Sequence, residues 1–333
     1  MLRYDNHLKT FAVFVTLAVL LILEATGQQA WPQLTAKYEK VRIAYPSRGL
    51  TVLPLRIGQV KGFFRDEALE AEIIQMRAGV AVTALTTGDI DYGAPLDSII
   101  RASARGQPLK GLLSFVNKPM HYLVSRTEIN SVKELRGKTL AISAFGSTEQ
   151  YTTYATLKAH GLDPEKKDVQ IVALGESPVR LEALKRGIVD ATVILIPHVI
   201  VAENLGFKIL AHAGEFIELS TPGLGAAERS LREKPDQVKR VVRAAARGLL
   251  FLRQNRGESL RIIKEWLSLD EEIAGKAYDM GLKSFSEDGS PSDKGLLTSI
   301  RLAQEGAAVK KDVPLSKVFE PGILREVQNE LKR

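Results

Sequence analysis

ALTTGDIDY, residues 84–92, returns in nearly the same form as ALKRGIVDA, residues 183–191. The matching positions are Ala84, Leu85, Gly88, Ile90 and Asp91 in the first copy, and Ala183, Leu184, Gly187, Val189 and Asp190 in the second. Each copy predicts an amphipathic helix that ends at a glycine, because glycine suits the left-handed conformation that closes many helices. A buried strand then begins after one further residue. One helix–glycine–strand step therefore occurs at matching points of two successive α/β units.

The stretches around both copies alternate short apolar runs with amphipathic segments. Strands are predicted at 41–45, 70–76, 90–94 and 109–116, and again at 121–126, 138–143, 168–174, 189–195 and 207–213. Helices are predicted between them, including one over 50–64 that Pro54 interrupts. Beyond about Gly225 the patterning is helical, with Pro235 as the first residue of a long amphipathic helix. The predicted fold class is α/β, with mostly parallel sheets flanked by helices.

Composition narrows the class of protein further. The chain has 333 residues, 45% of them hydrophobic and 26% charged, which is typical of a soluble protein with two domains or one split domain. It has no cysteine, and this excludes disulfides, thiolate metal sites and cysteine nucleophiles together. The net charge of +7 indicates solubility, with an anionic ligand or surface as the alternative.

One helix carries a cluster of cations. The residues are Lys239, Arg240, Arg243 and Arg247. They share the polar face of the helix and have no aromatic residues between them. We therefore expect a solvated surface and no nucleic-acid binding.

The N-terminus has the three parts of a secretory signal peptide. Arg3 and Lys9 precede an unbroken apolar run over 11–23, and small residues follow, so we expect cleavage near Gly27 or Ala30. The run is too short to span a hydrocarbon core of about 30 Å comfortably. Residues 1–30 are therefore predicted to direct export, and an uncleaved anchor is the alternative.

Five phrases of the chain occur in a recognisable order. They are VRIAYPS at 41–47, ALTTGDIDYGAP at 84–95, SVKELRGKTLAISAFGST at 131–148, EALKRGIVDA at 182–191 and KPDQVKRVVRA at 234–244. In this order they resemble the periplasmic solute-binding proteins of ABC importers, in the branch that binds nitrate, alkylsulfonates, taurine and thiamine precursors. The resemblance covers nearly the whole chain after Val41.

The resemblance implies the type II periplasmic-binding-protein fold. Lobe 1 would comprise residues 31–118 and 216–333, and lobe 2 residues 119–215, with crossing segments near 118–125 and 216–222. A small-molecule ligand would bind in the cleft between the lobes, which close around it like a hinge. The resemblance further implies a periplasmic location and delivery of the ligand to a membrane permease. We expect a monomer without a cofactor or a metal.

Ligands of open parallel sheets gather beyond the carboxyl ends of strands and at helix N-termini. In lobe 1 we expect hydroxyl donors and close backbone approach after the first strand, with an arginine able to pair with an anion or simply to remain solvated. The turn after the third strand would offer only backbone or apolar contacts. The candidates are Ser47, Arg48, Gly49 and Thr51 after the first strand, Arg77 after the second, and Ala94, Pro95 and Leu96 after the third.

In lobe 2 the same rule selects a helix start with free N–H groups and hydroxyls that suit an anion. A direct alternative exists, because Ser147 and Gln150 fit a capping box in which the serine serves its own helix. The segments 175–177 and 196–198 also follow strands, and His198 in the second of them can equally be a surface histidine. The candidates are Phe145 as an apolar wall, Gly146, Ser147 and Thr148 at the helix start, and Pro197 and His198.

Asp91 and Asp190, the matched carboxylates of the repeated phrase, stand at the beginnings of strands. Ligands gather at the opposite ends, so we expect these carboxylates to serve a turn or a cap. The histidines are isolated from one another in the sequence, and no motif for a catalytic serine, a phosphate loop or a zinc helix is present.

These observations predict a binding protein for a small, anionic organic solute rather than an enzyme. The alternatives are an enzyme on the same fold, similar to thiamine-pyrimidine synthases or chorismate-processing enzymes, and a ligand-binding sensor. The export signal favours the binding protein, because those enzymes work inside the cell.

Overall fold

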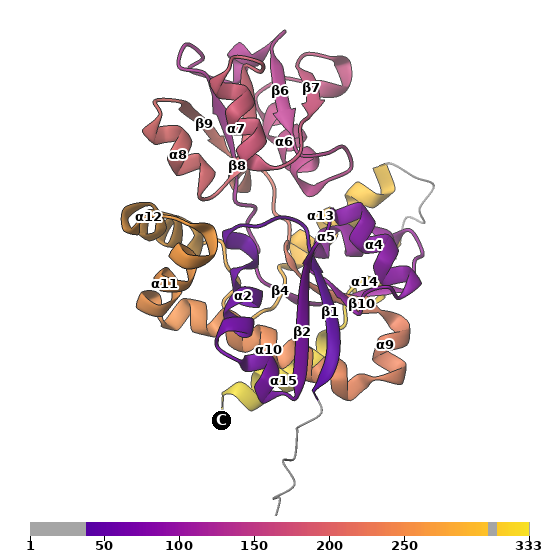
Figure 1. The fold of residues 1–333 in the computed structure, drawn as a ribbon. Coiled ribbons are helices and arrows are strands. Elements are labelled where there is room, and N and C mark those ends of the chain that lie inside the picture. The colour runs from indigo at the N-terminus through magenta and orange to yellow at the C-terminus, as the bar shows by residue number, and fades with distance from the viewer. Residues whose placement is uncertain (1–37, 306–311, 333) are drawn as a thin grey trace, which may run out of the picture. The chain divides into compact units, whose positions relative to one another are not determined.

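Two five-stranded sheets form the framework of the residues that the computed structural model describes, 38–305 and 312–332 (Figure 1). Helices flank both sheets, so the predicted two-lobed α/β class is confirmed. The predicted signal peptide, residues 1–30, lies outside the described residues. No helix in the described part of the chain is long and apolar enough to cross a membrane.

The first sheet has the strand order β2-β1-β3-β10-β4. β1 is parallel to β2 and β3, whereas β10 runs antiparallel to β3 and β4. The strands are β1 (Glu39–Tyr45), β2 (Leu69–Gln75), β3 (Tyr92–Gly93), β4 (Leu109–Ser114) and β10 (Gly223–Ala227). The sheet is therefore mixed: every strand except β10 runs in one direction, and the C-terminal ends of β1, β2 and β3 share one edge.

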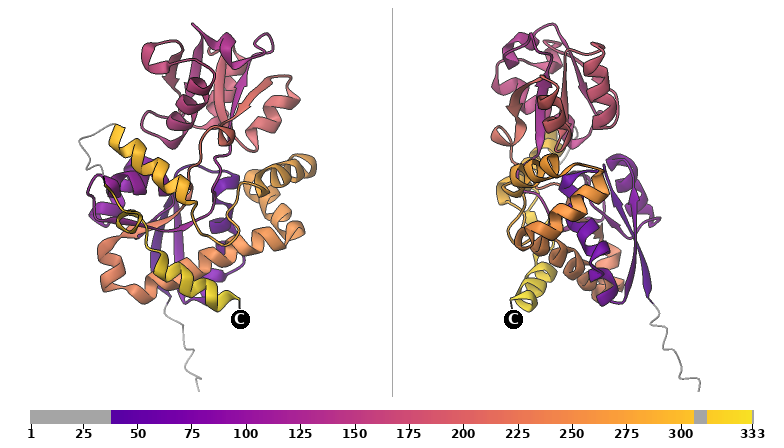
Figure 2. Two further views of the ribbon diagram at one scale, coloured as in Figure 1. Left: turned by 180° about the vertical axis from the view of Figure 1, so that it is seen from behind. Right: turned by 60° about the vertical axis from the view of Figure 1, so that its left-hand side comes forward.

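The helices of the first sheet come from both ends of the chain. Those from the N-terminal part are η1 (Leu50–Val52), α2 (Leu53–Val60), α3 (Phe63–Asp66), α4 (Ala78–Thr87) and α5 (Leu96–Ala104). Those from the C-terminal part are α9 (Glu228–Glu233), α10 (Pro235–Gln254), α11 (Arg256–Leu267), α12 (Glu271–Leu282), α13 (Asp293–Glu305), α14 (Leu315–Val318) and α15 (Pro321–Leu331). Both views in Figure 2 show this C-terminal part, coloured orange to yellow, around the first sheet, with α12 and α13 reaching the second lobe, where they contact α8 (His198–Asn204) and α6 (Thr148–Ala159).

The second sheet repeats the plan with the order β7-β6-β8-β5-β9. β6 is parallel to β7 and β8, and β5 runs antiparallel to β8 and β9. The strands are β5 (His121–Ser125), β6 (Thr139–Ile142), β7 (Gln170–Ala173), β8 (Ala191–Leu195) and β9 (Lys208–His212). The helices are η2 (Val132–Leu135), α6 (Thr148–Ala159), η3 (Pro164–Lys166), α7 (Ser177–Lys185), α8 (His198–Asn204) and η4 (Ala213–Glu215).

Each antiparallel strand is the first strand after the chain passes from one sheet to the other. The chain leaves the first sheet after β4 and enters the second at β5, then returns from β9 to β10. All strands of the second sheet thus lie within residues 119–215. The lobe boundaries and the hinge motion stay predictions.

The repeated phrase has the same structural role in both sheets. Gly88 and Gly187 follow α4 and α7 with φ of 93° and 69°, as a left-handed glycine at a helix end requires. The backbone N–H of Arg42 on β1 donates to Asp91 Oδ2 at 2.8 Å, and that of Thr139 on β6 donates to Asp190 Oδ2 at 2.9 Å. Both aspartates therefore bond to the backbone of a neighbouring parallel strand, within β1 for Asp91 and at the start of β6 for Asp190, and serve the scaffold as their sequence position predicted.

Several elements differ from the sequence-based expectation. Pro54 does not interrupt the first helix but lies in the first turn of α2, where proline lacks only an N–H that has no helical partner. β10 was missed because its sequence, GLGAA, lacks β-branched residues. Glycine is required there, since a Cβ on Gly223 would lie 2.1 Å from the carbonyl oxygen of Leu113.

The long helix α10 packs along α2 and supplies much of the first lobe's core. Its apolar positions are buried as the spacing predicted: Val238, Val241, Val242, Ala245, Leu249 and Leu252. Close approach to α2 depends on Gly248, because a Cβ at that position would lie 2.1 Å from the carbonyl oxygen of Pro54. The contact is therefore backbone against backbone.

The basic face of α10 is not a simple solvated surface, which corrects the expectation from the sequence. Its cations pair with carboxylates from three other parts of the first lobe. The pairs are Lys239 with Glu326 and Glu330, Arg240 with Glu39, Arg243 with Glu67 and Glu330, and Arg247 with Asp66. The sequence could not show this, because the partners lie far away along the chain.

Gly248→Ala tests the contact between α10 and α2. We expect it to lower the free energy of unfolding by about 1–3 kcal/mol, because the added methyl group overpacks a backbone contact. Gly257→Ala is the matched control: Gly257 is an exposed helical residue whose Cβ would meet nothing within 4 Å. The control should be neutral or stabilise by up to about 1 kcal/mol. Urea unfolding measures both, and equal stability of the two variants would contradict the packing argument.

Candidate functional site

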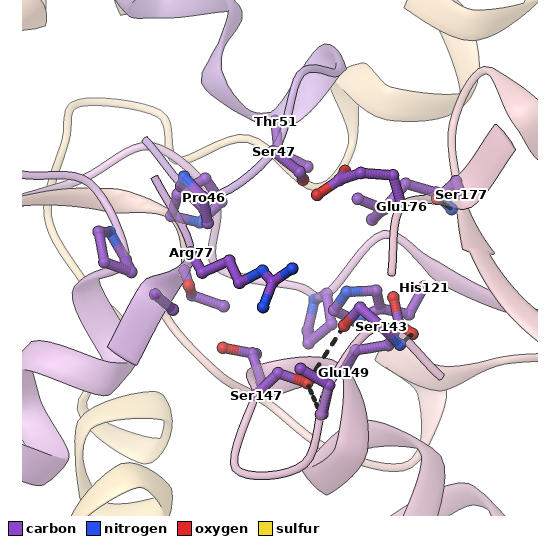
Figure 3. A pocket seen from close by; sticks show the side chains of 18 of the residues that line it. Pro46, Ser47, Thr51, Arg77, His121, Ser143, Ser147, Glu149, Glu176 and Ser177 are labelled. Atoms are coloured by element: carbon purple, nitrogen blue, oxygen red, sulfur yellow. Dashed lines mark hydrogen bonds between the residues drawn. The ribbon is translucent and has the colours of Figure 1, made fainter. Parts of the chain in front are cut away.

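A cavity of about 140 Å³ lies where the strand ends of the two sheets face one another (Figure 3). Most of its lining residues belong to the connections that follow β1, β2 and β3 and to those that follow β6, β7 and β8. The two crossing segments supply most of the others. The lining residues are Pro46, Ser47, Thr51, Arg77, Ala78, Pro95, Pro119, Met120, His121, Ser143, Ala144, Ser147, Thr148, Glu149, Gly175, Glu176, Ser177, Arg180, Leu195, Thr221 and Pro222. The location follows the strand-end rule for open parallel sheets.

The structure brings together part of the predicted site. The predicted residues that line this cavity are Ser47, Thr51, Arg77, Pro95, Ser147 and Thr148. A second cavity of about 300 Å³ shares Ser47, Glu176 and Ser177 with the first and contains the predicted Arg48, Pro197 and His198. The Arg48 guanidinium lies 5.9 Å from the ring centre of Trp266. Whether any of these residues contacts a ligand stays a prediction.

Other predicted residues do not line either cavity. Ala94 and Leu96 are fully buried in the core of the first lobe, and Phe145 is 61% exposed. A Cβ on Gly49 would lie 3.7 Å from the carbonyl oxygen of Ile196, so this glycine lies where the end of β8 approaches the first lobe. Gly146 has a φ of 76°, and its carbonyl oxygen accepts a hydrogen bond from Arg101.

At the helix start of α6 the two predicted hydroxyl groups make hydrogen bonds within the protein, including the capping bond that the sequence offered as the alternative. Ser147 Oγ accepts from the Gln150 N–H at 3.3 Å and donates to the Ala144 carbonyl at 2.7 Å. Thr148 Oγ1 donates to Asp97 Oδ2 at 2.6 Å. Both hydroxyls are thus engaged within the protein. What the turn can still offer an anion is the backbone N–H groups of Thr148 and Glu149, which have no partner within the helix.

Asp97, on α5, is a residue that sequence reasoning missed. Its side chain is fully buried and pairs with Arg101, which is 3% exposed. It also accepts hydrogen bonds from Thr148 Oγ1 on α6 and from Thr221 Oγ1, at 2.9 Å, on the crossing segment. The available signal was the Asp–Arg spacing of four residues on one helix, which brings the two side chains together.

Arg101 completes this connection between the lobes. Its Nη2 donates to Ser98 Oγ at 2.9 Å within α5 and to the Gly146 carbonyl oxygen at 3.3 Å in the second lobe. Its guanidinium also lies 4.5 Å from the ring centre of Tyr151 on α6. One buried ion pair in the first lobe therefore contacts the first turn of α6 and the loop before it.

A second buried ion pair lies at the cavity wall within the second lobe. Arg180 Nη2 contacts Glu149 Oε2 at 2.8 Å, and the Ser143 N–H donates to Glu149 Oε1 at 2.6 Å. Arg180 also donates to the carbonyl oxygens of Val193 and Gly175. These contacts join the ends of β6, β7 and β8. Burial raises the pKa of Glu149 to about 7 despite the neighbouring arginine.

His121, at the start of β5, is also buried at the cavity. Its Nδ1 lies 3.1 Å from Thr152 Oγ1 on α6. Burial, and then the positive charge of Arg180, lower the pKa of His121 to about 3. The imidazole is therefore neutral near pH 7 and holds α6 against β5.

Two charged side chains of the cavity have no such partner. Arg77 precedes α4 and Glu176 precedes α7, and neither side chain makes a hydrogen bond or an ion pair within the described residues. Figure 3 shows both extending into the cavity, from opposite sides. The described part of the chain has no cluster of three or more His, Cys, Asp or Glu side chains suited to a metal ion.

The comparisons with known proteins agree with this architecture. A family model described as NMT1/THI5 like matches residues 51–259. The riboflavin-binding protein RibY of Chloroflexus aurantiacus is 23% identical over 224 residues, covering 64% of this chain and 62% of that protein. The 4-amino-5-hydroxymethyl-2-methylpyrimidine phosphate synthase of Schizosaccharomyces pombe is 29% identical over 102 residues, covering 29% of this chain and 30% of the synthase.

Solved structures with the same fold include two periplasmic binding proteins. The aliphatic sulphonate binding protein SsuA of Escherichia coli has a TM-score of 0.65 at 19% identity, with 84% of this chain and 91% of SsuA covered. The nitrate-binding protein NrtA of Synechocystis PCC 6803 has a TM-score of 0.67 at 16% identity, with 88% and 89% covered. At these identities the likeness shows the fold.

Asp97→Asn tests the connection between the lobes. It leaves the buried Arg101 without its carboxylate, so we expect the free energy of unfolding to fall by about 3–5 kcal/mol. The double variant Asp97→Asn with Arg101→Met removes both charges and should recover part of the loss. Urea unfolding of both variants measures the effect. A single variant as stable as the native protein would contradict the role of the pair.

His121→Asn tests the effect of burial on the histidine, because an asparagine amide does not titrate and can make a hydrogen bond with Thr152 Oγ1 in place of Nδ1. The folded-state pKa of about 3 lies below the ordinary value of 6.5, so the unfolded chain takes up the proton first. This contribution to stability is present above about pH 6.5 and is lost as the pH falls toward 3. The stability contribution of Glu149 has the opposite dependence on pH, because its folded-state pKa is raised above the ordinary value. That contribution is present below the ordinary pKa of the carboxyl and is lost as the pH rises through about 7.

The stability difference between the native protein and His121→Asn should therefore grow with pH by about 1.4 kcal/mol per unit between about pH 4 and pH 6. Urea unfolding at several pH values measures it. Parallel pH profiles of the two proteins would show that the pKa of His121 is not shifted.

Proposed function

The chain belongs to the NMT1/THI5-like family, and from that premise we propose that it is a periplasmic solute-binding protein that captures a small organic anion between its two lobes and delivers it to the permease of an ABC importer. The predicted export signal supports the location. Binding proteins among the similar structures and relatives support solute capture. Their names differ in the ligand, so none of those ligands is transferred to this chain.

The observation that carries the proposal is Arg77. Its guanidinium is exposed, lines the cavity and makes no ion pair or hydrogen bond within the part of the chain that the structure describes. An arginine of this kind can give an oxyanion two parallel, charge-assisted hydrogen bonds. Hydroxyl groups and backbone N–H groups from both lobes surround it, and these donors also suit an anion.

The cavity also has a form that suits capture and release. Arg77 and Ser47 belong to the first lobe, while Glu176 and the first turn of α6 belong to the second. A solute that contacts both sets stabilises the arrangement in which they face one another. The crossing segments 118–125 and 216–222 are the positions at which we expect the hinge.

Catalysis on the same fold is the competing function, since a synthase is among the relatives. The contacts at the cavity favour binding. His121 contacts Thr152, whose hydroxyl donates to the carbonyl oxygen of Glu149 at 3.0 Å, and Glu149 pairs with Arg180. These groups are occupied in structural contacts, so within the described residues no cavity serine is paired with a histidine base.

Arg77→Gln tests the proposed function. Isothermal titration with ethanesulfonate, nitrate and benzoate should find at least one anion that the native protein binds without turnover. Loss of a charge-assisted contact of about 1.5–3 kcal/mol should weaken its binding roughly 10-fold to 150-fold. The matched control is Arg65→Gln, an exposed arginine of α3 that does not line the cavity. Unchanged affinity in Arg77→Gln, or conversion of the ligand to a product, would refute the proposal.

A further inference from the structure

The charges at the cavity are not all equivalent, because some are already neutralised within the protein. The charged lining residues are Arg77, Arg180, Glu149 and Glu176. Arg180 and Glu149 form a buried pair at 2.8 Å, with side chains 1% and 6% exposed. Their other polar atoms bond to Ser143, Val193 and Gly175. One cation, Arg77, and one carboxylate, Glu176, are left facing the cavity.

The carboxylate of Glu176 makes no hydrogen bond or ion pair within the described residues, although its negative charge partly offsets the burial that lowers the pKa of Arg180. Glu176 is the N-cap residue of α7, but its side chain makes no capping hydrogen bond, and Pro178 follows in the first turn. The adjacent Ser177 and Arg180 are buried and bonded, whereas Glu176 is exposed. It also lines the second cavity. Figure 3 shows its carboxylate on the side of Ser47 and Thr51, across the cavity from the base of Arg77.

This arrangement is unfavourable for a solute that carries only a negative charge. Such a solute, seated against Arg77, would share a small and partly desolvated cavity with the unpaired carboxylate of Glu176. Removing an unpaired charge from water is costly, and a second negative charge nearby adds repulsion. A solute with a cationic nitrogen beside its anionic group would satisfy both side chains at once.

We infer that the solute is zwitterionic: its anionic group binds Arg77, and its protonated amine or other cationic nitrogen binds Glu176, which selects it over simple anions. The inference rests on the proposed function and narrows the class of substrate. Glu176 is then a specificity-determining residue, and Arg77 is the residue on which binding of either class depends. The hydroxyl groups of Ser47 and Thr51 lie on the same side of the cavity as the Glu176 carboxylate (Figure 3), and they can accept hydrogen bonds from the same cationic nitrogen.

Two matched pairs of probes test the inference, each differing by one amino group. The pairs are ethanesulfonate with taurine, and propionate with β-alanine. Isothermal titration should show that the native protein prefers the amino compound of at least one pair by about tenfold or more, as for a charge-assisted contact. In Glu176→Gln the preference should shrink toward unity through weaker binding of the amino compound, while the simple anion binds as before or more tightly.

Glu182→Gln is the matched control. Glu182 lies on the same helix, α7, but pairs with Lys185 and Arg186 on the surface and does not line the cavity. Glu182→Gln removes one negative charge, as Glu176→Gln does. It should leave the affinities for the simple anion and for its amino partner as they are in the native protein. Thermal unfolding of both variants without ligand checks that each is folded.

The outcomes separate failure of the inference from failure of the proposed function. If a simple anion binds as tightly as its amino partner, and Arg77→Gln weakens the binding of both compounds, the protein binds simple anions. The inference that the solute is zwitterionic is then wrong. If Glu176→Gln strengthens both members of a pair equally, Glu176 competes with the ligand for Arg77, and the inference is also wrong. If none of the four probes nor the anions above binds, the proposed function and the inference fail together.

Discussion

The buried carboxylate of Asp97 is the contact on which the geometry of the site depends. It lies on α5 of the first lobe and accepts hydrogen bonds from Thr148 at the start of α6 and from Thr221 on the returning crossing segment. Arg101 balances its charge and reaches Gly146 and Tyr151. Since a fully buried charge must be paired, these contacts define how the first turn of α6 lies against the first lobe. The cavity wall is built on that turn.

The same rule explains which side chains of the cavity can meet a solute. Arg180 and Glu149 neutralise one another inside the second lobe, where they join the ends of three strands, and His121 is held neutral by burial. Arg77 and Glu176 stand at the two sides, without partners among the described residues. Groups that hold the scaffold are thus buried and paired, while Arg77 and Glu176 are exposed and unpaired at the cavity. Under the proposed function, the ligand would complete the charge balance of this cavity.

Sequence patterning reached most of the architecture and part of the site. The repeated phrase at 84–92 and 183–191 correctly indicated two α/β units, and Asp91 and Asp190 serve the scaffold, as their position predicted. The strand-end rule placed Ser47, Thr51 and Arg77 at the cavity. It pointed to the segment 175–177 but did not single out Glu176. It could not identify Asp97 or Arg180, because their roles depend on contacts with residues distant along the chain.

What the sequence determined by itself is local: the alternation of helices and strands, the glycines that end helices, and the strand ends at which the cavity lies. These follow from periodicity and backbone conformation, which neighbouring residues control. Only the tertiary structure decided which polar groups are already satisfied. The sequence predicted Thr148 and Ser147 as ligand donors, and their hydroxyls are engaged within the protein, whereas Glu176 was not among the predicted contacts and lines the cavity. Pairing of charges is a property of distances in space, and sequence spacing does not report those distances.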